Sequence, residues 1–303
     1  MTETKSDVSV IIPYYNREKY IHATIQSVLE QTLKPLEIII VNDCSREPAR
    51  RELDGYSDTC KIVDLSKNVG LAGARNAGMR LARGKYIALL DDDDIWLPHK
   101  LEVQHRYMEQ HPECFLVHGA VWAFFSNKPE EFWTWCVPDS LTLAQSLTDL
   151  CWVCPSTMFF RARDAQAVGG FDPAFRQCED RDFVIRCCAA GLRIHCINEP
   201  LARLRRQDHD RLTSNKWRML RTDFKMCWKH RKYYFGAYGM RGIVSFVLEK
   251  SHTATRDTPY LDGAGRLVLR FVEPKYSLKK GFRDPIVSGR AEKIEAVAVP
   301  DLR

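Results

Sequence analysis

Four short apolar runs alternate with stretches of helical spacing in the first hundred residues, and this alternation constrains the fold more than any other feature. The runs cover residues 8–12, 36–41, 60–65 and 86–90. Each has the length and composition of a buried strand. Helical spacing fills the intervals, most clearly at residues 21–29 and 71–82. This order predicts an α/β fold with a doubly wound, mostly parallel sheet, right-handed crossovers and helices on both faces.

The second half of the chain has a mixed pattern. We expect strands at residues 115–125, 157–161, 193–197 and 201–205. A helix is expected at residues 181–190, ended by Gly191, and residues 212–250 have helical spacing with an apolar stripe among Lys and Arg. The sequence therefore predicts one domain over residues 1–211 and a basic, largely helical extension over residues 212–303.

Four consecutive acids, Asp91 to Asp94, follow directly on the apolar run at residues 86–90. Adjacent carboxylates repel one another, and a divalent cation is the simplest way to neutralise them. Oxygen ligands suit a hard ion such as Mg²⁺ or Mn²⁺. The carboxyl edge of a parallel sheet is also where α/β enzymes hold phosphate-bearing ligands. The acid run thus indicates an enzyme that handles a nucleotide or a phosphorylated substrate.

The acid run has two other interpretations. It can be a solvated turn in which Asp94 caps the helical pattern that begins near Pro98. An EF-hand loop is excluded, because its sixth position would be Trp96 instead of glycine and its fifth would be Ile95, which has no ligand oxygen.

Two further predicted strands end in polar loops, Pro13 to Arg17 and Val41 to Ser45, which should lie at the same sheet edge as the acid run. Asp43 can accept hydrogen bonds from a base or a ribose, or it can cap the next helix. Tyr15 can stack on a base or simply pack.

A glycine-containing segment at residues 68–78 is neither a GxGxxG fingerprint nor a Walker loop, because no GKS or GKT follows. Its glycines allow the backbone to approach a ligand closely. Arg75 within it can reach a base carbonyl or a phosphate, or it can be a surface arginine at an ordinary turn.

Together these segments resemble family 2 glycosyltransferases with the GT-A fold, over about residues 7–212. The resemblance implies a metal-dependent, inverting transfer of a sugar from a nucleoside diphosphate donor, most often a UDP sugar. The acceptor would be a hydroxyl of a saccharide or of a lipid-linked molecule, as in polysaccharide biosynthesis. Residues 1–211 would then be the nucleotide-sugar-binding catalytic domain.

The resemblance also implies roles for residues of the acid run and the neighbouring loops. Pro13 and Tyr15 match the loop that holds the base, Asp43 the acid that contacts the uracil, and Arg75 a residue that also reads the base. Asp93 matches the direct metal ligand, for Mn²⁺ or Mg²⁺, while Asp91 or Asp92 faces the ribose.

The reaction needs a second carboxylate that takes the proton of the attacking hydroxyl. The segment Gln177 to Phe183 resembles the family's ED motif, in which Asp180 matches the catalytic base and Glu179 orients the acceptor or Asp180. These acids can also be simple helix N-terminal acids favoured by the helix dipole. The resemblance implies that His209 lies near the diphosphate, where it can be a second metal ligand. It can also be an ordinary surface loop histidine.

Charge divides the chain unevenly. Residues 201–303 carry 23 Lys and Arg against 11 Asp and Glu, although the net charge of the whole chain is only +6. A basic extension indicates an anionic partner such as a membrane surface, and without a recognised motif we do not expect nucleic acid. The start lacks a secretion signal and no apolar run reaches about 18 residues, so we expect a cytoplasmic protein, peripheral on the inner face of the membrane.

Two rival functions remain open. A sugar-phosphate nucleotidyltransferase would share the sheet and the metal, but it should have a glycine-rich loop after the first strand, where this chain has Pro13 to Asn16. A non-catalytic nucleotide-binding scaffold would need neither Asp93 nor Asp180.

Overall fold

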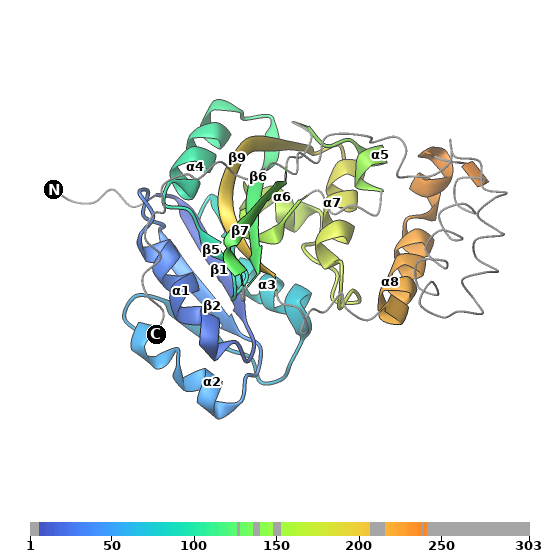
Figure 1. The fold of residues 1–303 in the computed structure, drawn as a ribbon. Helices are drawn as coiled ribbons and strands as arrows, with labels where there is room; N and C mark the ends of the chain where they lie inside the picture. Colours follow the sequence, from blue (N-terminus) through green and yellow to red (C-terminus); the bar gives the residue numbers. More distant parts are fainter. Residues whose placement is uncertain are drawn as a thin grey trace.

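The computed structural model describes residues 6–125, 128–135, 140–147, 153–206, 216–237 and 239–240 (Figure 1). Its strands are β1 (Val8–Tyr14), β2 (Glu37–Asn42), β3 (Lys61–Asp64), β4 (Tyr86–Leu89), β5 (Ile95–Trp96), β6 (Cys114–Phe125), β7 (Lys128–Trp135), β8 (Phe159–Arg161) and β9 (Arg193–Arg206). Its α-helices are α1 (Glu18–Leu29), α2 (Glu47–Arg51), α3 (Gly70–Leu81), α4 (Lys100–Gln110), α5 (Leu143–Ser146), α6 (Ala162–Ala167), α7 (Glu179–Ala189) and α8 (Lys216–Lys229). Short 3₁₀ turns lie at η1 (Asp54–Tyr56) and η2 (Pro155–Thr157).

The strands form one sheet in the order β3-β2-β1-β4-β8-β6-β9-β5, with β7 beside β6. Strands β3, β2, β1 and β4 are all parallel to their neighbours within this group, which confirms the alternating pattern of the first hundred residues. Beyond β4 the sheet is mixed, because β8 is antiparallel to both β4 and β6 while β9 is parallel to β6. The α/β class is therefore confirmed, with its parallel part confined mainly to the first half.

Helices cover both faces of this sheet, as predicted. Along β1, Val10 and Ile12 face a core that includes residues of α1 and α4, while Ile11 faces a core that includes residues of α3 and α7. Alternate residues of a strand point to opposite faces, so a strand apolar at every position needs a helix layer on each side. Tyr14 ends β1 with its hydroxyl donating to the Ala49 carbonyl of α2.

The second half differs from the prediction in several places: β7, α5 and α6 were not expected, and β8 begins at Phe159 and not at residue 157. The two strands expected at residues 193–197 and 201–205 are one strand, β9, whose register against β6 shifts where Ala120 faces Pro200. Proline has no N–H to donate to a ladder, which explains an irregularity at this point. Helix α7 begins at Glu179, two residues before the expected start, so both acids of the ED segment lie in its first turn.

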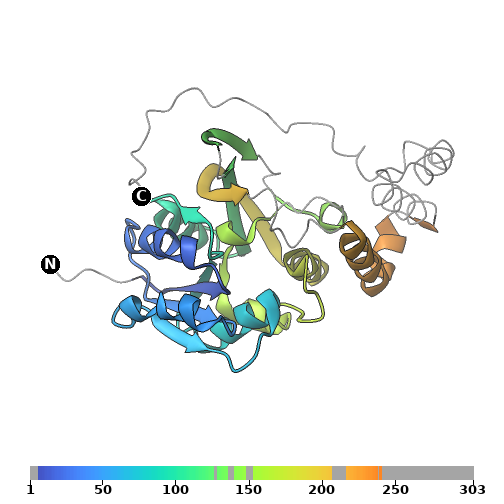
Figure 2. The same cartoon turned by 60° about the horizontal axis from the view of Figure 1, so that its bottom comes forward.

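Helix α8 packs against α7 on the side away from β1 to β3, as Figures 1 and 2 show. Met226 and Tyr234 join Phe175 and Ile185 in a separate apolar cluster between the two helices. Residues 216–229 and 231–237 are helical, as the spacing predicts, and residues 241–303 lie outside the described chain. The boundary between a domain and an extension at residue 211 stays a prediction. No helix in the described part is both long and apolar enough to cross a bilayer.

Candidate active site

The carboxyl ends of β1, β2 and β4 lie at one edge of the sheet, where hydrogen bonds connect their loops. The Asn16 N–H donates to Ser45 Oγ at 3.1 Å, and the Arg46 N–H donates to Asn16 Oδ1 at 2.9 Å. The Tyr15 N–H donates to Asp92 Oδ2 at 3.0 Å, which connects the first loop to the acid run. The structure therefore brings together the three loops that the sequence places at this edge.

Asp94 anchors the acid run to the rest of the fold. Its buried carboxylate accepts from Ser156 Oγ at 2.5 Å and from the Arg205 N–H at 3.1 Å, and its carbonyl accepts from Thr24 Oγ1 at 2.9 Å. It caps no helix, since α4 begins at Lys100 with His99 at its N-cap. The interpretation of Asp94 as a helix cap is therefore wrong, because this carboxylate is turned toward η2 and β9.

Asp93 is the acid of the run that is least tied to the protein. Within the described residues, no other residue donates a hydrogen bond to its carboxylate, whereas Asp91 and Asp92 each accept one. Asp93 forms an ion pair with Arg17, whose guanidinium Nη1 lies 3.4 Å from Asp93 Oδ2. Both side chains are partly exposed. Asp93 thus has lone pairs free for another ligand.

Neighbouring carboxylates of the acid run repel one another in a partly buried site. Burial raises the pKa values of Asp92, Asp93 and Asp94, and repulsion from neighbouring carboxylates raises them further. Arg17 opposes this rise in pKa at Asp92 and Asp93. Because bound Mn²⁺ or Mg²⁺ would relieve the repulsion, and carboxylate oxygens are the ligands that these ions prefer, the residues present fit such an ion.

Arg75 is wholly buried and binds two carboxylates. Its Nη1 donates to Glu179 Oε1 and its Nη2 to Asp91 Oδ1, both at 2.6 Å, and its guanidinium lies 5.3 Å from the centre of the Phe171 ring. The surface-arginine alternative is therefore wrong. The expected contact with a base is untested, and in this structure the guanidinium connects the end of β4 to the start of α7.

Glu179 and Asp180 lie side by side in the first turn of α7. Burial raises the pKa of Glu179 to about 7, with a further rise from Asp180 and an opposing effect from Arg75. Asp180 is half-buried, and its charge also acts on Arg75, so its carboxylate lies in the same electrostatic neighbourhood. Asp180 accepts a hydrogen bond from the Arg181 N–H at 2.8 Å.

Asp43 binds backbone N–H groups at a helix start, but not at the helix that the alternative interpretation expected. Its two carboxylate oxygens accept from the N–H groups of Val69 at 2.7 Å and Gly70 at 2.9 Å, so it caps α3 and not the next helix, α2. Burial raises its pKa. Each oxygen retains a second lone pair, so these contacts are compatible with a ligand N–H. Nearby, Pro13 is buried in β1 and Tyr15 is exposed.

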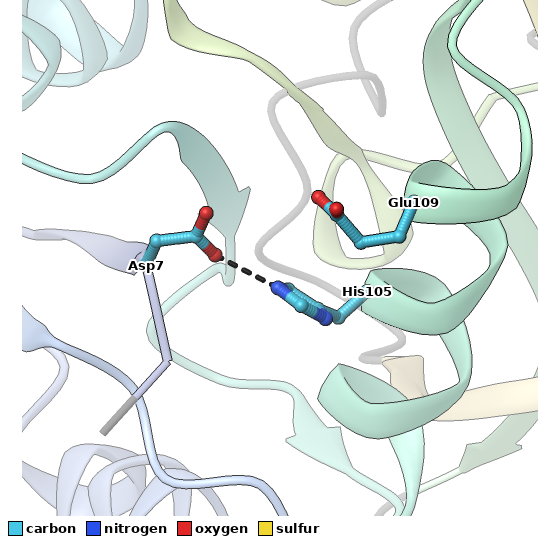
Figure 3. A group of neighbouring side chains, drawn as sticks. All are labelled: Asp7, His105 and Glu109. Carbon is cyan, nitrogen blue, oxygen red and sulfur yellow. Dashed lines mark hydrogen bonds and ion pairs between the residues drawn. The ribbon is translucent and has the colours of Figure 1, made fainter. Parts of the chain in front are cut away.

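A second cluster of candidate metal ligands, Asp7, His105 and Glu109, lies at the other end of β1 and β4 (Figure 3). Asp7 Oδ1 lies 2.8 Å from His105 Nε2, and Glu109 Oε1 accepts from Lys85 Nζ at 2.5 Å. A strand rises about 3.3 Å per residue, so the five residues from Tyr86 to Asp91 put this cluster roughly 16 Å from the acid run. Lys85 already supplies a positive charge here, and the cluster is separate from the site of the acid run.

Several residues that contact the acid run were not singled out by the sequence. Arg17 and Ser156 pair with Asp93 and Asp94, and the Arg205 Nε donates to the Asp93 carbonyl at 3.3 Å. Arg17 stands in a loop already marked as polar, which is a usable signal. Nothing local identifies Ser156 or Arg205, because β9 and η2 reach the acid run only through the fold. His209 lies outside the described residues.

Comparisons with known proteins point to one family. A family model described as glycosyl transferase family 2 matches residues 9–168. The Bacillus subtilis (strain 168) glycosyltransferase TuaG, whose name places it provisionally in teichuronic acid biosynthesis, is 34% identical over 221 residues, which cover 72% of this chain and 86% of TuaG. An Escherichia coli protein named UDP-Glc:alpha-D-GlcNAc-diphosphoundecaprenol beta-1,3-glucosyltransferase WfgD is 40% identical over 110 residues, 36% of this chain and 44% of WfgD.

Solved structures show the same fold. Residues 1–349 of S. aureus TarS in complex with UDP-GlcNAc align with a TM-score of 0.64 at 18% identity, covering 84% of this chain and 74% of that one. A longer TarS structure aligns with a TM-score of 0.60 at 19% identity, and this chain spans 43% of its length.

Proposed function

The chain belongs to glycosyltransferase family 2 and has the GT-A fold, and we propose that it moves a sugar from UDP to an acceptor hydroxyl with inversion at the sugar carbon. The observation that carries this proposal is the double contact of Arg75 with Asp91 and Glu179. This contact holds the start of α7 beside the carboxyl end of β4. Asp180 lies in the first turn of α7, and the acid run follows β4. An inverting transfer needs acids in two such positions.

Asp180 is the proposed base, which takes the acceptor's proton as its oxygen attacks the sugar. Glu179, paired with Arg75, holds the first turn of α7 in place so that this carboxylate meets the acceptor. Because Asp180 is partly exposed to solvent, an incoming acceptor hydroxyl can reach its carboxylate. This division of roles assigns proton transfer to one acid and positioning to its neighbour.

The donor would lie along the edge formed by the three loops. Asp43 and Tyr15 would contact the base, with Pro13 shaping the loop, and Asp91 or Asp92 would face the ribose. Asp93 would hold Mn²⁺ or Mg²⁺, with His209 as a second ligand. When bound, such an ion would supply charge stabilisation to the departing diphosphate.

The proposed acceptor is a lipid-linked saccharide. The name of WfgD describes transfer to a diphosphoundecaprenol-linked sugar, and this relative supports an acceptor of the same class here. The excess of Lys and Arg after residue 200 supports work at an anionic membrane surface, such as the cytoplasmic leaflet. We therefore propose a peripheral membrane enzyme.

A thermal-shift panel of UDP, GDP and dTDP sugars, each with and without Mn²⁺, tests the donor and the metal together. Ligands that bind only the folded state raise its melting temperature, so UDP sugars should raise it in the presence of Mn²⁺ and much less without the ion. Asp93→Asn should remove the effect of Mn²⁺, and Asp58→Asn, at an exposed acid after α2, should retain it. Equal shifts for the three nucleotides, or shifts independent of Mn²⁺, contradict the proposal.

A further inference from the structure

Helix α8 has an inner face that is firmly attached to α7. Asp223 accepts from Arg181 Nη1 at 3.1 Å, and directly after the end of α8 His230 Nε2 lies 2.9 Å from Asp182 Oδ1. Tyr234, just beyond α8, also contacts Arg181, with 2.9 Å between its hydroxyl and Arg181 Nη2. These residues are buried. The inner face therefore fixes α8 to the helix that carries Asp180.

The outer face of α8 has an exposed aromatic stripe, formed by Trp217, Phe224 and Trp228. Spacings of seven and four residues place these side chains within about 40° of one another around a helix with 3.6 residues per turn. Trp217 is 55% exposed, Phe224 42% and Trp228 73%. Large aromatic side chains that gather on one exposed face indicate an interaction surface.

Basic residues surround the aromatic stripe. Residues 216–237 contain seven Lys and Arg and a single acid, Asp223, which is buried in its ion pair with Arg181. One of the seven, Lys229, is paired with Asp172 and Asp182 of the catalytic part and does not count toward this surface. Arg221 is exposed beside the stripe, and Lys225 is exposed there too, with its ammonium donating to the Ala174 carbonyl. The outer face therefore presents aromatic rings inside a field of positive charge, a combination that suits the headgroup region of an anionic membrane.

We propose that this outer face, the aromatic stripe with its flanking Lys and Arg, binds the surface of an anionic phospholipid bilayer. The inference rests on the proposed function, since it gives the lipid-linked acceptor a route to Asp180. Arg181, the residue after Asp180, is held by Asp223 on the inner face, so a membrane on the outer face lies one helix away from the start of α7. A second copy of the chain is a poorer occupant, because two such basic faces repel each other.

Flotation of the full chain with lipid vesicles tests this surface without any donor, acceptor or metal. Vesicles of phosphatidylcholine with about 30% phosphatidylglycerol should carry the protein upward, and vesicles of phosphatidylcholine alone should carry much less. The Trp217→Ser, Trp228→Ser double variant should reduce the bound fraction about tenfold. Leu81→Ser, at an exposed apolar residue of α3, is the matched control and should bind like the wild type.

A charge-reversed variant, Arg218→Glu with Arg221→Glu, keeps the test meaningful if the double Trp variant does not fold. It should lose binding to anionic vesicles while the aromatic stripe is intact. Added NaCl should weaken wild-type binding, because salt screens the attraction. Flotation that survives both double variants overturns the proposal, and so does a wild-type protein that does not float with anionic vesicles. Wild-type self-association that the double Trp variant abolishes assigns the face to a second copy and also overturns it.

The flotation result does not depend on whether the proposed sugar transfer is right. Vesicle binding does not require UDP-sugar binding, so failure of the donor panel leaves flotation unchanged. If the outer face of α8 does not bind membranes but the proposed sugar transfer is right, transfer to a short water-soluble acceptor analogue continues in a protein that does not float.

Discussion

Arg75 donates a 2.6 Å hydrogen bond to Glu179, although 104 residues separate the two in sequence. The same guanidinium donates to Asp91, so one buried side chain fixes the end of β4 against the start of α7. Because Asp93 follows Asp91 and Asp180 follows Glu179, the contact sets the relative position of the two acids on which the proposed reaction depends.

Replacement of Arg75 by Lys should cost both stability and activity. A lysine keeps the charge but cannot donate in two directions from one rigid plane, so at least one buried carboxylate loses its partner. We expect a loss of about 3 kcal/mol in the free energy of unfolding and a fall of about 100-fold in kcat. Urea unfolding and a transfer assay measure these. Arg80→Lys, at an exposed site on the same helix, should change neither, and an Arg75→Lys variant as active as wild type would refute the bridging role.

Glu179 should give the rate profile an acid limb near neutral pH. Burial raises its pKa to about 7, and protonation removes the charge that pairs with Arg75, so kcat/KM should fall as pH decreases through this value. Glu179→Gln has no charge to lose and should be slower at every pH without this limb. The contribution of Glu179 to the free energy of unfolding depends on pH in the opposite direction to the rate. A raised pKa favours the folded state below the usual value of 4.5, and this contribution is lost as pH rises through about 7.

The pH–rate profiles of the wild type and Glu179→Gln, measured under saturating donor and metal, check this. An acid limb that survives unchanged in Glu179→Gln would assign the titration to another group.

Arg17 should compete with a divalent ion for Asp93. Its guanidinium is 3.4 Å from Asp93 Oδ2, at the carboxylate with no hydrogen bond from another described residue. Removing this charge in Arg17→Gln should tighten Mn²⁺ binding about fivefold, a modest effect because both side chains are partly in water. Titration of Mn²⁺ followed by water-proton relaxation gives the dissociation constant. Arg46→Gln, at an exposed residue in the neighbouring loop, should have little effect. Weaker Mn²⁺ binding in Arg17→Gln contradicts the competition.

Asp182 should stabilise the protein above pH 4 and lose this contribution in acid. The carboxylate is buried, but contacts with His230, Lys229 and Arg186 outweigh the effect of burial and lower its pKa to about 2. A lowered pKa stabilises the fold above the usual value of 3.8, and the stabilisation disappears as pH falls towards 2. The shift corresponds to about 2 kcal/mol at pH 7.

Urea unfolding of Asp182→Asn at several pH values measures this contribution. The variant should be less stable than wild type at pH 7, and the difference should shrink below pH 4. Asp58→Asn, at an exposed acid, is the control. A difference that is constant down to pH 2 would mean that the charge of Asp182 does not contribute.

The parallel half of the sheet was predictable because its information is local. The apolar runs around Ile11, Ile39 and Ile87 indicate strands that are buried on both faces, because a strand that is apolar at every position must be covered on each side. The polar loops that follow then meet at one edge by topology alone. For the same reason the convergence of Asp43 and Asp93 at this edge follows from the order of strands and helices in the sequence.

The contacts between distant elements could not be predicted in this way. Nothing near Arg75 in sequence shows that it is buried, because its partner Glu179 comes from another helix. The attachment of Asp94 to Ser156 and of Arg181 to Asp223 is equally non-local. Such pairs depend on how helices and strands pack, and spacing within one segment carries no signal for them.

The most direct test of the account is Asp180→Asn, measured for donor binding and transfer on the same preparation. The amide preserves the shape of the side chain but cannot accept a proton, so UDP-sugar affinity in the presence of Mn²⁺ should stay within about twofold of wild type while kcat falls by at least about 1,000-fold. Isothermal titration and a product assay give the two numbers. If Asp180→Asn transfers sugar at the wild-type rate, Asp180 is not the base and the proposed mechanism is wrong.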